Sequence, residues 1–423
     1  MEGVSFSLLV LSHIDIYIYS LVLSFIFLYP ILKIYKAYLF HPYFLVLLFT
    51  VFANAAPIFL IFMNEISLND FMYFVLSEVL FWIGFFFFFK KKPRIVVYKI
   101  KNEERILTLM FYFFLGSFII ITIYSYIKFG IPLFLWSRVA LYVDSDGFGL
   151  IGRIQPMLKL FIIYYGFEKL FDNSINKRRK LFYFFVFSLM IIEGVLGGSK
   201  SSIMYFLIAY YFYLIINKKQ FLSKKGYLIF AVLIISTGIV GPMLKGVSLV
   251  DGLLTYAYRF IASGDVYYYS LPSQNYKYIN IEKPMQFIFS GFLAPARLLS
   301  HSSMELHPGN QLFYLIYPKL EGLMSGPNSR MPFLSLILFG GFGGILFSFL
   351  TGIFFAFITN ISKILFYGNK LFFPLYIYII LMISVFIFDI SLGMSNLFSI
   401  FINLLIYIIV MMISALLRTK YHQ

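Results

Sequence analysis

Long apolar runs separated by short polar segments extend along the whole chain. Eleven runs stand out, over residues 6–29, 43–63, 68–89, 106–127, 153–171, 181–198, 200–216, 227–244, 333–359, 372–391 and 396–417. Each is close to the roughly 20 residues that carry an α-helix across about 30 Å of hydrocarbon. Backbone groups in lipid must be paired within the segment, which favours helices. The pattern predicts an all-α polytopic membrane protein with about eleven transmembrane helices, in a range of about ten to fourteen.

One long interval, residues 245–332, lacks a clean membrane span. It divides the chain into an N-terminal bundle of about eight helices over 1–244, a large loop over 245–332, and about three further helices over 333–423. Within the loop, 285–299 and 312–324 are apolar enough to lie on the bilayer or dip into it. The interval also holds most of the ionisable residues that hydropathy leaves unexplained, so we expect the functional site to lie here.

The distribution of basic residues between the runs predicts an orientation. The strongest cluster lies between Lys90 and Arg105, and by the positive-inside rule it is cytoplasmic. Alternation from that point also places Lys177–Lys180, Lys218–Lys225 and Arg418 inside. The N-terminus and the large loop are then external, and the C-terminus is cytoplasmic. The first apolar run lacks a basic leading region and a small-residue cleavage site, so we expect a retained helix rather than a signal peptide.

Composition supports this interpretation and excludes several chemistries. The chain of 423 residues is 61% hydrophobic and 12% charged, whereas a soluble domain carries about 25% charged residues. The net charge of +16 comes from clusters between apolar runs, which favours membrane anchors over nucleic-acid binding. There is no cysteine, so disulfides, thiolate metal sites and cysteine nucleophiles are excluded.

The first candidate site lies between Arg259 and Pro272. Arginine stays charged and can grip a phosphate through two hydrogen bonds, so Arg259 is a candidate anion contact. Asp265 is a candidate proton acceptor. The rings and hydroxyls of Tyr267, Tyr268 and Tyr269 suit sugar rings. The alternative is an interfacial helix with a solvated Arg–Asp pair.

The second candidate site lies between Arg297 and Gly309. Arg297 and His301 are four residues apart, so in a helix they would share one face. His301 or Glu305 is a candidate proton acceptor. His301 and His307 are six residues apart, which is a poor spacing for zinc ligands on a helix, and no third histidine is near. We therefore expect no metal site.

Further cations are expected on the external side. Arg330 precedes a span, so we place it at the height of the lipid headgroups, either as an anion contact or as a snorkelling anchor. Arg138, Arg153 and Lys200 join it from other connections, and Glu193 is expected to pair with Lys200 or Arg153. The run Gly197-Gly198-Ser199-Lys200 lacks the spacing of a nucleotide-binding phosphate loop. The natural target of these cations is a lipid carrying phosphate or pyrophosphate.

Three short motifs resemble the Wzy-type oligosaccharide repeat-unit polymerases of bacterial O-antigen synthesis. They are the Gly-rich run at 193–202, the Arg259 to Asp265 segment, and Gly326-Pro-Asn-Ser-Arg330 before a Gly-rich helix. The spacings from Arg138 to Gly149 and from Arg330 to Gly341 are similar to an Arg-x10-Gly pattern of that family. The spacing from His301 to Gly309 resembles a pattern of the related O-antigen ligases.

The resemblance implies glycosyl transfer at the periplasmic face of the bacterial inner membrane. Donor and acceptor are glycans linked to undecaprenyl pyrophosphate, and no cofactor is implied. We expect Arg259, Arg297 and Arg330 to hold the pyrophosphates, and membrane lipids and a chain-length regulator to be partners. Two alternatives stay open: a ligase that attaches the glycan to lipid A core, and a Wzx-type flippase, for which we expect cationic cavities within the bundle and short loops.

Overall fold

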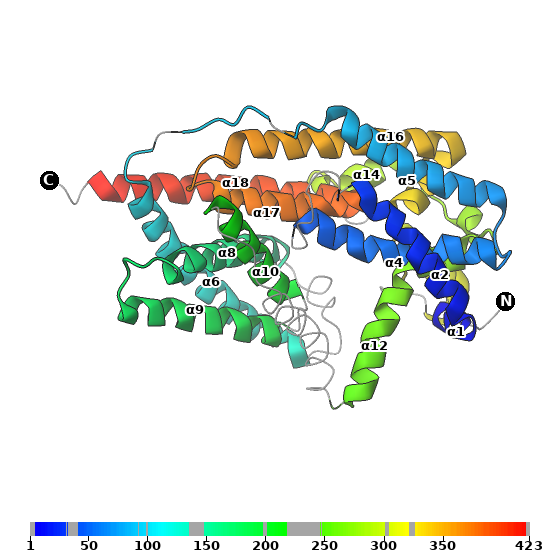
Figure 1. Ribbon diagram of the computed structural model, residues 1–423, viewed down its shortest axis with the longest axis horizontal. Coiled ribbons are helices and arrows are strands. Elements are labelled where there is room, and N and C mark those ends of the chain that lie inside the picture. Colours follow the sequence, from blue (N-terminus) through cyan, green and yellow to red (C-terminus); the bar gives the residue numbers. More distant parts are fainter. Residues whose placement is uncertain are drawn as a thin grey trace. The chain divides into compact units, whose positions relative to one another are not determined.

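The computed structural model describes residues 5–30, 32, 41–91, 93–98, 100–134, 148–197, 201–217, 246, 248–300, 304–320 and 326–419. The ordered elements of this part of the chain are all helical (Figure 1). The predicted span 227–244 lies outside the described residues.

The first half of the described chain contains ten helical elements. In chain order they are α1 (Phe6–Ser12), α2 (Ile14–Ser24), η1 (Phe25–Leu28), α4 (Pro42–Phe62), α5 (Leu68–Phe88), α6 (Glu103–Phe129), η2 (Pro132–Phe134), α8 (Phe148–Leu170), α9 (Lys177–Leu196) and α10 (Ser201–Ile216).

The second half continues with shorter helices and ends with three long segments. These elements are α12 (Leu249–Ile261), η3 (Ala262–Gly264), α13 (Asp265–Ser270), η4 (Asn275–Tyr278), α14 (Pro284–Leu293), α15 (Pro308–Ile316), η6 (Pro318–Leu320), α16 (Met331–Phe366), α17 (Phe373–Ile383), η7 (Ser384–Ile387) and α18 (Ile390–Thr419).

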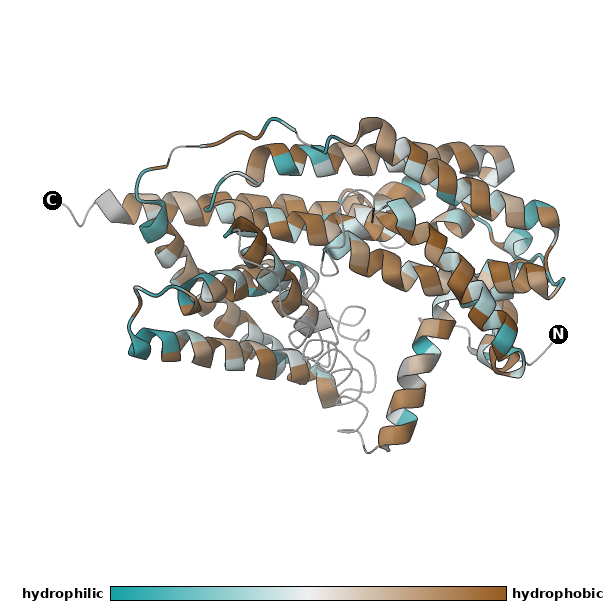
Figure 2. Ribbon diagram, in the orientation of Figure 1, coloured by the Kyte–Doolittle hydropathy of each residue, from teal (hydrophilic) through white to brown (hydrophobic). Residues whose placement is uncertain are grey.

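Several of these helices are long and apolar enough to cross a membrane. Within the described residues five pass this test, namely α4, α5, α6, α16 and α18, and the bent pair formed by α1 with α2 and η1 makes a sixth if it is one span. Apolar residues dominate the helices, and polar residues gather at their ends and in the connections (Figure 2). This is the architecture of a multi-pass helical membrane protein; the prediction of eleven spans and an external large loop stays a prediction.

The chain forms two compact units, each of which draws on all three predicted segments. Unit 1 comprises Met1–Pro93, Thr255–Ile361 and Leu381–Phe398. Unit 2 comprises Arg94–Leu254, Ser362–Ile380 and Ser399–Gln423. The large predicted loop is therefore no separate body, because most of its described helices belong to unit 1 with α4 and α5.

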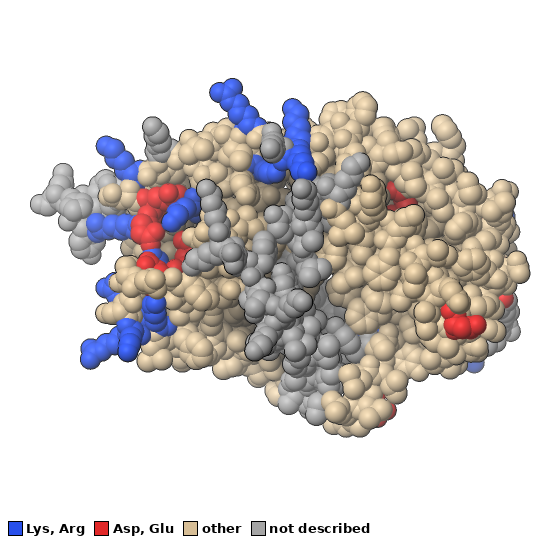
Figure 3. Space-filling model, in the orientation of Figure 1, with Lys and Arg blue, Asp and Glu red and all other residues tan. Residues whose placement is uncertain are grey.

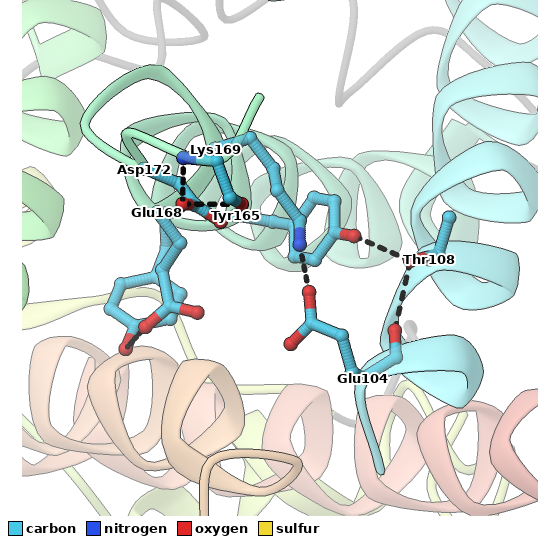
Figure 4. Close-up of polar contacts among 8 residues, drawn as sticks. Glu104, Thr108, Tyr165, Glu168, Lys169 and Asp172 are labelled. Atoms are coloured by element: carbon cyan, nitrogen blue, oxygen red, sulfur yellow. Dashed lines mark hydrogen bonds and ion pairs between the residues drawn. The ribbon is translucent and has the colours of Figure 1, made fainter. Parts of the chain in front are cut away.

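Unit 2 gathers its charges at one end, where α6 and α9 begin and α8 ends (Figure 3). Lys169 near the end of α8 forms an ion pair with Glu104 in the first turn of α6 (Figure 4). Tyr165 and Thr108 join the same two helices through their hydroxyl oxygens, 2.7 Å apart. The Glu103 carboxylate accepts a hydrogen bond from the Leu371 amide, just before α17. The connections that precede α6 and α17 and the connection between α8 and α9 therefore lie at the same end of unit 2.

Helix α16 reverses direction at Gly340, within unit 1. Gly340 has φ +68° and ψ −166°, a conformation that is essentially restricted to glycine. The Ser348 hydroxyl donates to the Ser335 hydroxyl at 3.3 Å, although a continuous helix would separate these residues by about 20 Å. Residues 331–339 therefore fold back along the helix that follows Gly340.

Helix α13 packs into the apolar core of unit 1, although its residues belong to the predicted external loop. Val266, Tyr267 and Tyr268 lie in one cluster with Phe59 of α4 and Phe74 of α5. The close approach depends on Gly264, because a Cβ atom there would lie 2.6 Å from the Ala56 Cβ and 2.7 Å from the Ala53 carbonyl oxygen. The absence of a side chain at Gly264 thus brings Asp265 against α4.

Candidate functional site

Unit 1 contains a buried cluster of ionisable side chains, which we call the acidic centre. Its members are Glu78 of α5, Asp265 and Tyr267 of α13, His307 before α15, Arg330 before α16, and Asp389 before α18. Arg330 interacts electrostatically with Tyr267, Asp265, Glu78 and Asp389. Segments far apart in the sequence thus bring three carboxyl groups to a single guanidinium.

Arg330 is held inside unit 1 and has only 7% of its surface exposed. Its Nε and Nη2 donate to the carbonyl oxygen of Ser263 at 3.1 and 2.9 Å. Its guanidinium carbon also lies 5.5 Å from the centre of the Phe388 ring, a cation–π arrangement. The burial of Arg330 does not fit a snorkelling side chain that reaches the surface. Because α16 reverses at Gly340, Arg330 begins a segment that folds back into unit 1, where it interacts electrostatically with Glu78.

Asp265 is the first residue of α13, two positions after the carbonyl that Arg330 binds. One of its carboxylate oxygens, Oδ1, is buried and has no hydrogen-bond partner among the described residues. Burial raises the pKa of Asp265 to about 7, against the opposing effect of the Arg330 charge. A carboxyl group that titrates near neutral pH is well suited to accept a proton.

Two of the three tyrosines predicted to stack on sugar are core residues. Tyr267 is 1% exposed and Tyr268 is 7% exposed. The Tyr267 ring packs edge-on against Phe74, and the Tyr268 ring stacks on Phe6. Because Gly264 brings α13 into the bundle, these rings cannot form an open platform; Tyr269 is half-buried.

His307 and Asp389 form a partly exposed pair at one side of the acidic centre. The His307 Nε2 lies 3.8 Å from the Asp389 Oδ2, and the exposed fraction of the His307 side chain is 33%. Asp389 also accepts the Leu392 amide at 3.0 Å, so its carboxylate caps α18. In the sequence, His307 belongs to a poor spacing for zinc ligands and Asp389 lies within a predicted span. Only the fold brings these two residues together.

Glu78 is the member of the centre that sequence reasoning missed. It is 6% exposed, belongs to an apolar run, and lies beside Asn54 of α4. A carboxyl group in the middle of a predicted span is itself a signal, because charges at membrane depth usually face a partner or a cavity.

Glu305 and the two other loop arginines lie outside the acidic centre. The Glu305 carboxylate accepts hydrogen bonds from the Glu282 and Lys283 amides at 3.0 and 2.9 Å, so it holds the backbone just before α14. Arg297 follows the end of α14 with φ +59°, so the expected helical face shared with His301 does not form. Arg259 on α12 is exposed, and no ion pair joins it to Asp265 in the described structure. Asp265 has Arg330 as its neighbouring cation instead.

Unit 2 contains a second charged group, the basic centre, formed by the buried Lys159 and the half-buried Arg153 and Glu193. Lys159 is 4% exposed and forms an ion pair with Glu193. Gln155 donates to Glu193 at 3.3 Å, and Arg153 donates to the Ser399 hydroxyl at 2.9 Å. Lys159 on the facing helix is thus an ion-pair partner of Glu193 that was not predicted, and the predicted partner Lys200 lies outside the described residues.

The remaining predicted contacts, His301, Arg138 and Lys200, lie outside the described residues. Among the residues that the structure describes, no group of three or more histidines and carboxylates is arranged to hold a metal ion.

These features define a helical membrane protein with two charged centres, one acidic and one basic. Comparison with protein-family models, with curated proteins and with solved structures gave no match for this chain.

Proposed function

We propose that this protein is a Wzy-type polymerase that joins lipid-linked oligosaccharide repeat units at the periplasmic face of the bacterial inner membrane. In this proposal a sugar hydroxyl of one undecaprenyl-pyrophosphate-linked unit attacks the anomeric carbon of a second lipid-linked glycan. A new C–O bond forms and the bond between that carbon and the pyrophosphate oxygen breaks. The leaving pyrophosphate takes the electron pair, and a protein group accepts the hydroxyl proton.

The proposal rests on the environment and the raised pKa of the Asp265 carboxyl group. This group lies in a buried, charged centre of a membrane protein, has one oxygen without a partner, and has a pKa of about 7. A general base of this kind contributes about 10²- to 10⁴-fold in rate. Asp265 also belongs to one of the motifs that resemble the polymerases. We therefore assign the acceptance of the hydroxyl proton to Asp265.

The arginines divide into two roles under this proposal. Arg259 and Arg297 are exposed and belong to the predicted external loop, so they are available to a pyrophosphate. Arg330 is buried and bound to the Ser263 carbonyl, so it is a positioning residue. It fixes the turn before Asp265 and offsets the negative charge that Asp265 carries after deprotonation.

The test of the proton acceptor is the glycan ladder of a deletion strain that carries plasmid-borne variants. Asp265→Asn keeps the shape of the side chain and removes the base, so we expect long chains to fall at least about 100-fold. Asp251→Asn is the matched control, since Asp251 is exposed in the first turn of α12. A normal ladder with Asp265→Asn at equal membrane abundance contradicts the assignment. Loss of all attached glycan in the deletion strain identifies a ligase instead.

A second pair of variants tests the pyrophosphate contacts. Arg259→Ala and Arg297→Gly both remove an exposed cation, and glycine accepts the positive φ at position 297 without strain. We expect shorter chains from each variant, with thermal stability unchanged or, for Arg297→Gly, slightly raised. Normal ladders from both variants remove these arginines from the binding role.

A Wzx-type flippase is the second candidate, and the basic centre of unit 2 favours it. Arg153, Lys159 and Glu193 bring charged groups into a helical bundle, as expected of a path for a charged headgroup. The deletion strain separates the two candidates. Lipid-linked units that accumulate on the cytoplasmic face indicate a flippase, whereas single repeat units on the lipid A core indicate a polymerase.

A further inference from the structure

The acidic centre of unit 1 has more carboxyl groups than cations. Glu78 interacts with Arg330 and with Tyr267, which also interacts with Tyr73 on the same helix as Glu78. Arg330 interacts in turn with Asp265 on α13 and with Asp389 before α18, which pairs with His307. Arginine does not lose its proton in proteins. The state of the centre is therefore decided by how many of the three carboxyl groups are ionised.

Asp389 has partners of its own. Its Oδ1 accepts the Leu392 amide at the start of α18, and its Oδ2 lies 3.8 Å from the His307 Nε2. A helix N-terminus stabilises a negative charge, and a protonated histidine can balance it. Asp389 is also next to the part of the centre where the His307 side chain reaches solvent, with 33% of that side chain exposed.

Among the residues that the structure describes, Arg330 is the cation that acts on both Glu78 and Asp265. One positive charge balances one carboxylate, and a second buried carboxylate would be uncompensated. Leaving an unpaired charge in a protein interior costs about 3–5 kcal/mol, so such a group takes up a proton instead.

The Tyr267 hydroxyl is an independent sign that the centre has a vacant hydrogen-bonding position. Tyr267 is 1% exposed, its hydroxyl has no hydrogen-bond partner within the described part of the chain, and it interacts electrostatically with Glu78 and Arg330. A buried hydroxyl without a partner is costly. A tyrosine hydroxyl can donate to a carboxylate and accept from a carboxylic acid, so it can serve whichever of the two groups carries the proton.

We propose that the acidic centre is a proton-binding site in the interior of the helical bundle, in which Glu78 and Asp265 share one exchangeable proton over the Arg330 charge. The raised pKa of Asp265 agrees with this balance. The site does not depend on glycosyl transfer, because it follows from the charges of unit 1 alone. It makes the protein responsive to protonation whatever substrate it handles.

The test is infrared spectroscopy of the full-length protein in lipid, titrated from about pH 5 to about pH 9. A protonated carboxylic acid in apolar surroundings gives a carbonyl band that is distinct from those of carboxylates and amides, and deuterium exchange shifts it. We expect such a band, equivalent to one carboxyl group per molecule, which disappears as the pH rises. This measurement needs no variant, so it stands even where a substitution disturbs folding.

Two single variants then test the sharing. Glu78→Gln and Asp265→Asn each leave one carboxyl group, which Arg330 then balances, so we expect each variant to lose the band completely. Asp251→Asn, at an exposed position, should retain it. Elution as a single species in detergent confirms that each variant is folded.

Each possible outcome tests either the existence of the proton site or the sharing of the proton. Wild-type protein without the band at the acid end overturns the site, and so does a band that persists in both single variants. A band lost in only one variant assigns the proton to that carboxyl group and overturns the sharing. A normal glycan ladder with Asp265→Asn contradicts the proposed function but does not affect this result, so the two failures are distinguishable.

Discussion

The acidic centre of unit 1 and the basic centre of unit 2 both contain buried charged side chains, but they balance their charges differently. In the basic centre Lys159 lies opposite Glu193, and Gln155 donates to the same carboxylate. The cation and the carboxylate of this ion pair lie on the facing helices α8 and α9. In the acidic centre one guanidinium serves Glu78 and Asp265, and the hydroxyl of Tyr267 has no partner.

This difference separates a structural ion pair from a reactive site. The two charges of an ion pair compensate each other, and their main effect is on packing and stability. A centre with an excess carboxyl group titrates near neutral pH, and strongly perturbed groups of this kind gather at functional sites. The acidic centre is therefore the better candidate for chemistry, although Arg153 and Lys159 were easier to notice as charges at membrane depth.

The largest effect is expected where the complete pair is broken. Lys159→Met leaves Glu193 buried without its cation, which should lower the free energy of unfolding by about 3–5 kcal/mol. Adding Glu193→Gln removes the unpaired charge, so the double variant should return to within about 1 kcal/mol of the wild type. Thermal unfolding in detergent of the wild type, the two single variants and the double variant completes a double-mutant cycle. A double variant as unstable as the single one shows that the pair is not isolated.

An intermediate effect is expected from moving α13 relative to Arg330. Gly264→Ala places a Cβ atom against the Ala53 carbonyl and the Ala56 side chain, so the free energy of unfolding should fall by about 1–3 kcal/mol. Because Asp265 follows directly, its pKa should also change. Gly116→Ala on α6 is the control, since a Cβ there meets nothing within 4 Å. Equal stability of the two variants argues against the close packing of α13 on α4.

A third effect is a change in how stability depends on pH. The folded-state pKa of Asp265 is about 7 and the ordinary value is 3.8. Between these values the folded protein binds more protons at this site than the unfolded chain, so stability is highest at low pH and falls as the pH rises toward and through 7. Asp265→Asn should flatten this part of the profile, which thermal unfolding at a series of pH values measures. An unchanged slope shows that Asp265 does not titrate there.

The helices could be predicted closely from hydropathy because lipid imposes a simple rule on them. The predicted spans 43–63 and 68–89 correspond to α4 (Pro42–Phe62) and α5 (Leu68–Phe88). Backbone pairing within each segment is local, so it can be inferred from the segment alone. The reversal at Gly340 was not inferred, because a glycine in an apolar run is equally compatible with a continuous helix.

The candidate site was predicted only in part. Asp265 and Arg330 were identified from residue type and motif, but Arg330 was placed at the membrane surface and Tyr267 on an open face. The two positions have different causes: Gly264 allows α13 to enter the core beside α4, whereas the reversal of α16 at Gly340 turns Arg330 back into unit 1. Glu78 gave a signal as a carboxyl group within a span, but its partners come from three distant segments.

The sequence by itself determined that this is a multi-pass helical membrane protein, because hydropathy and backbone pairing act within each segment. Residue type alone also marked Asp265 and Arg330 as candidates for chemistry. Only the tertiary structure decided which charges meet: Lys159 with Glu193, His307 with Asp389, and Arg330 with both Glu78 and Asp265. The physical reason is that the energy of a buried charge depends on its neighbours in space, and these neighbours are set by helix packing across long sequence separations.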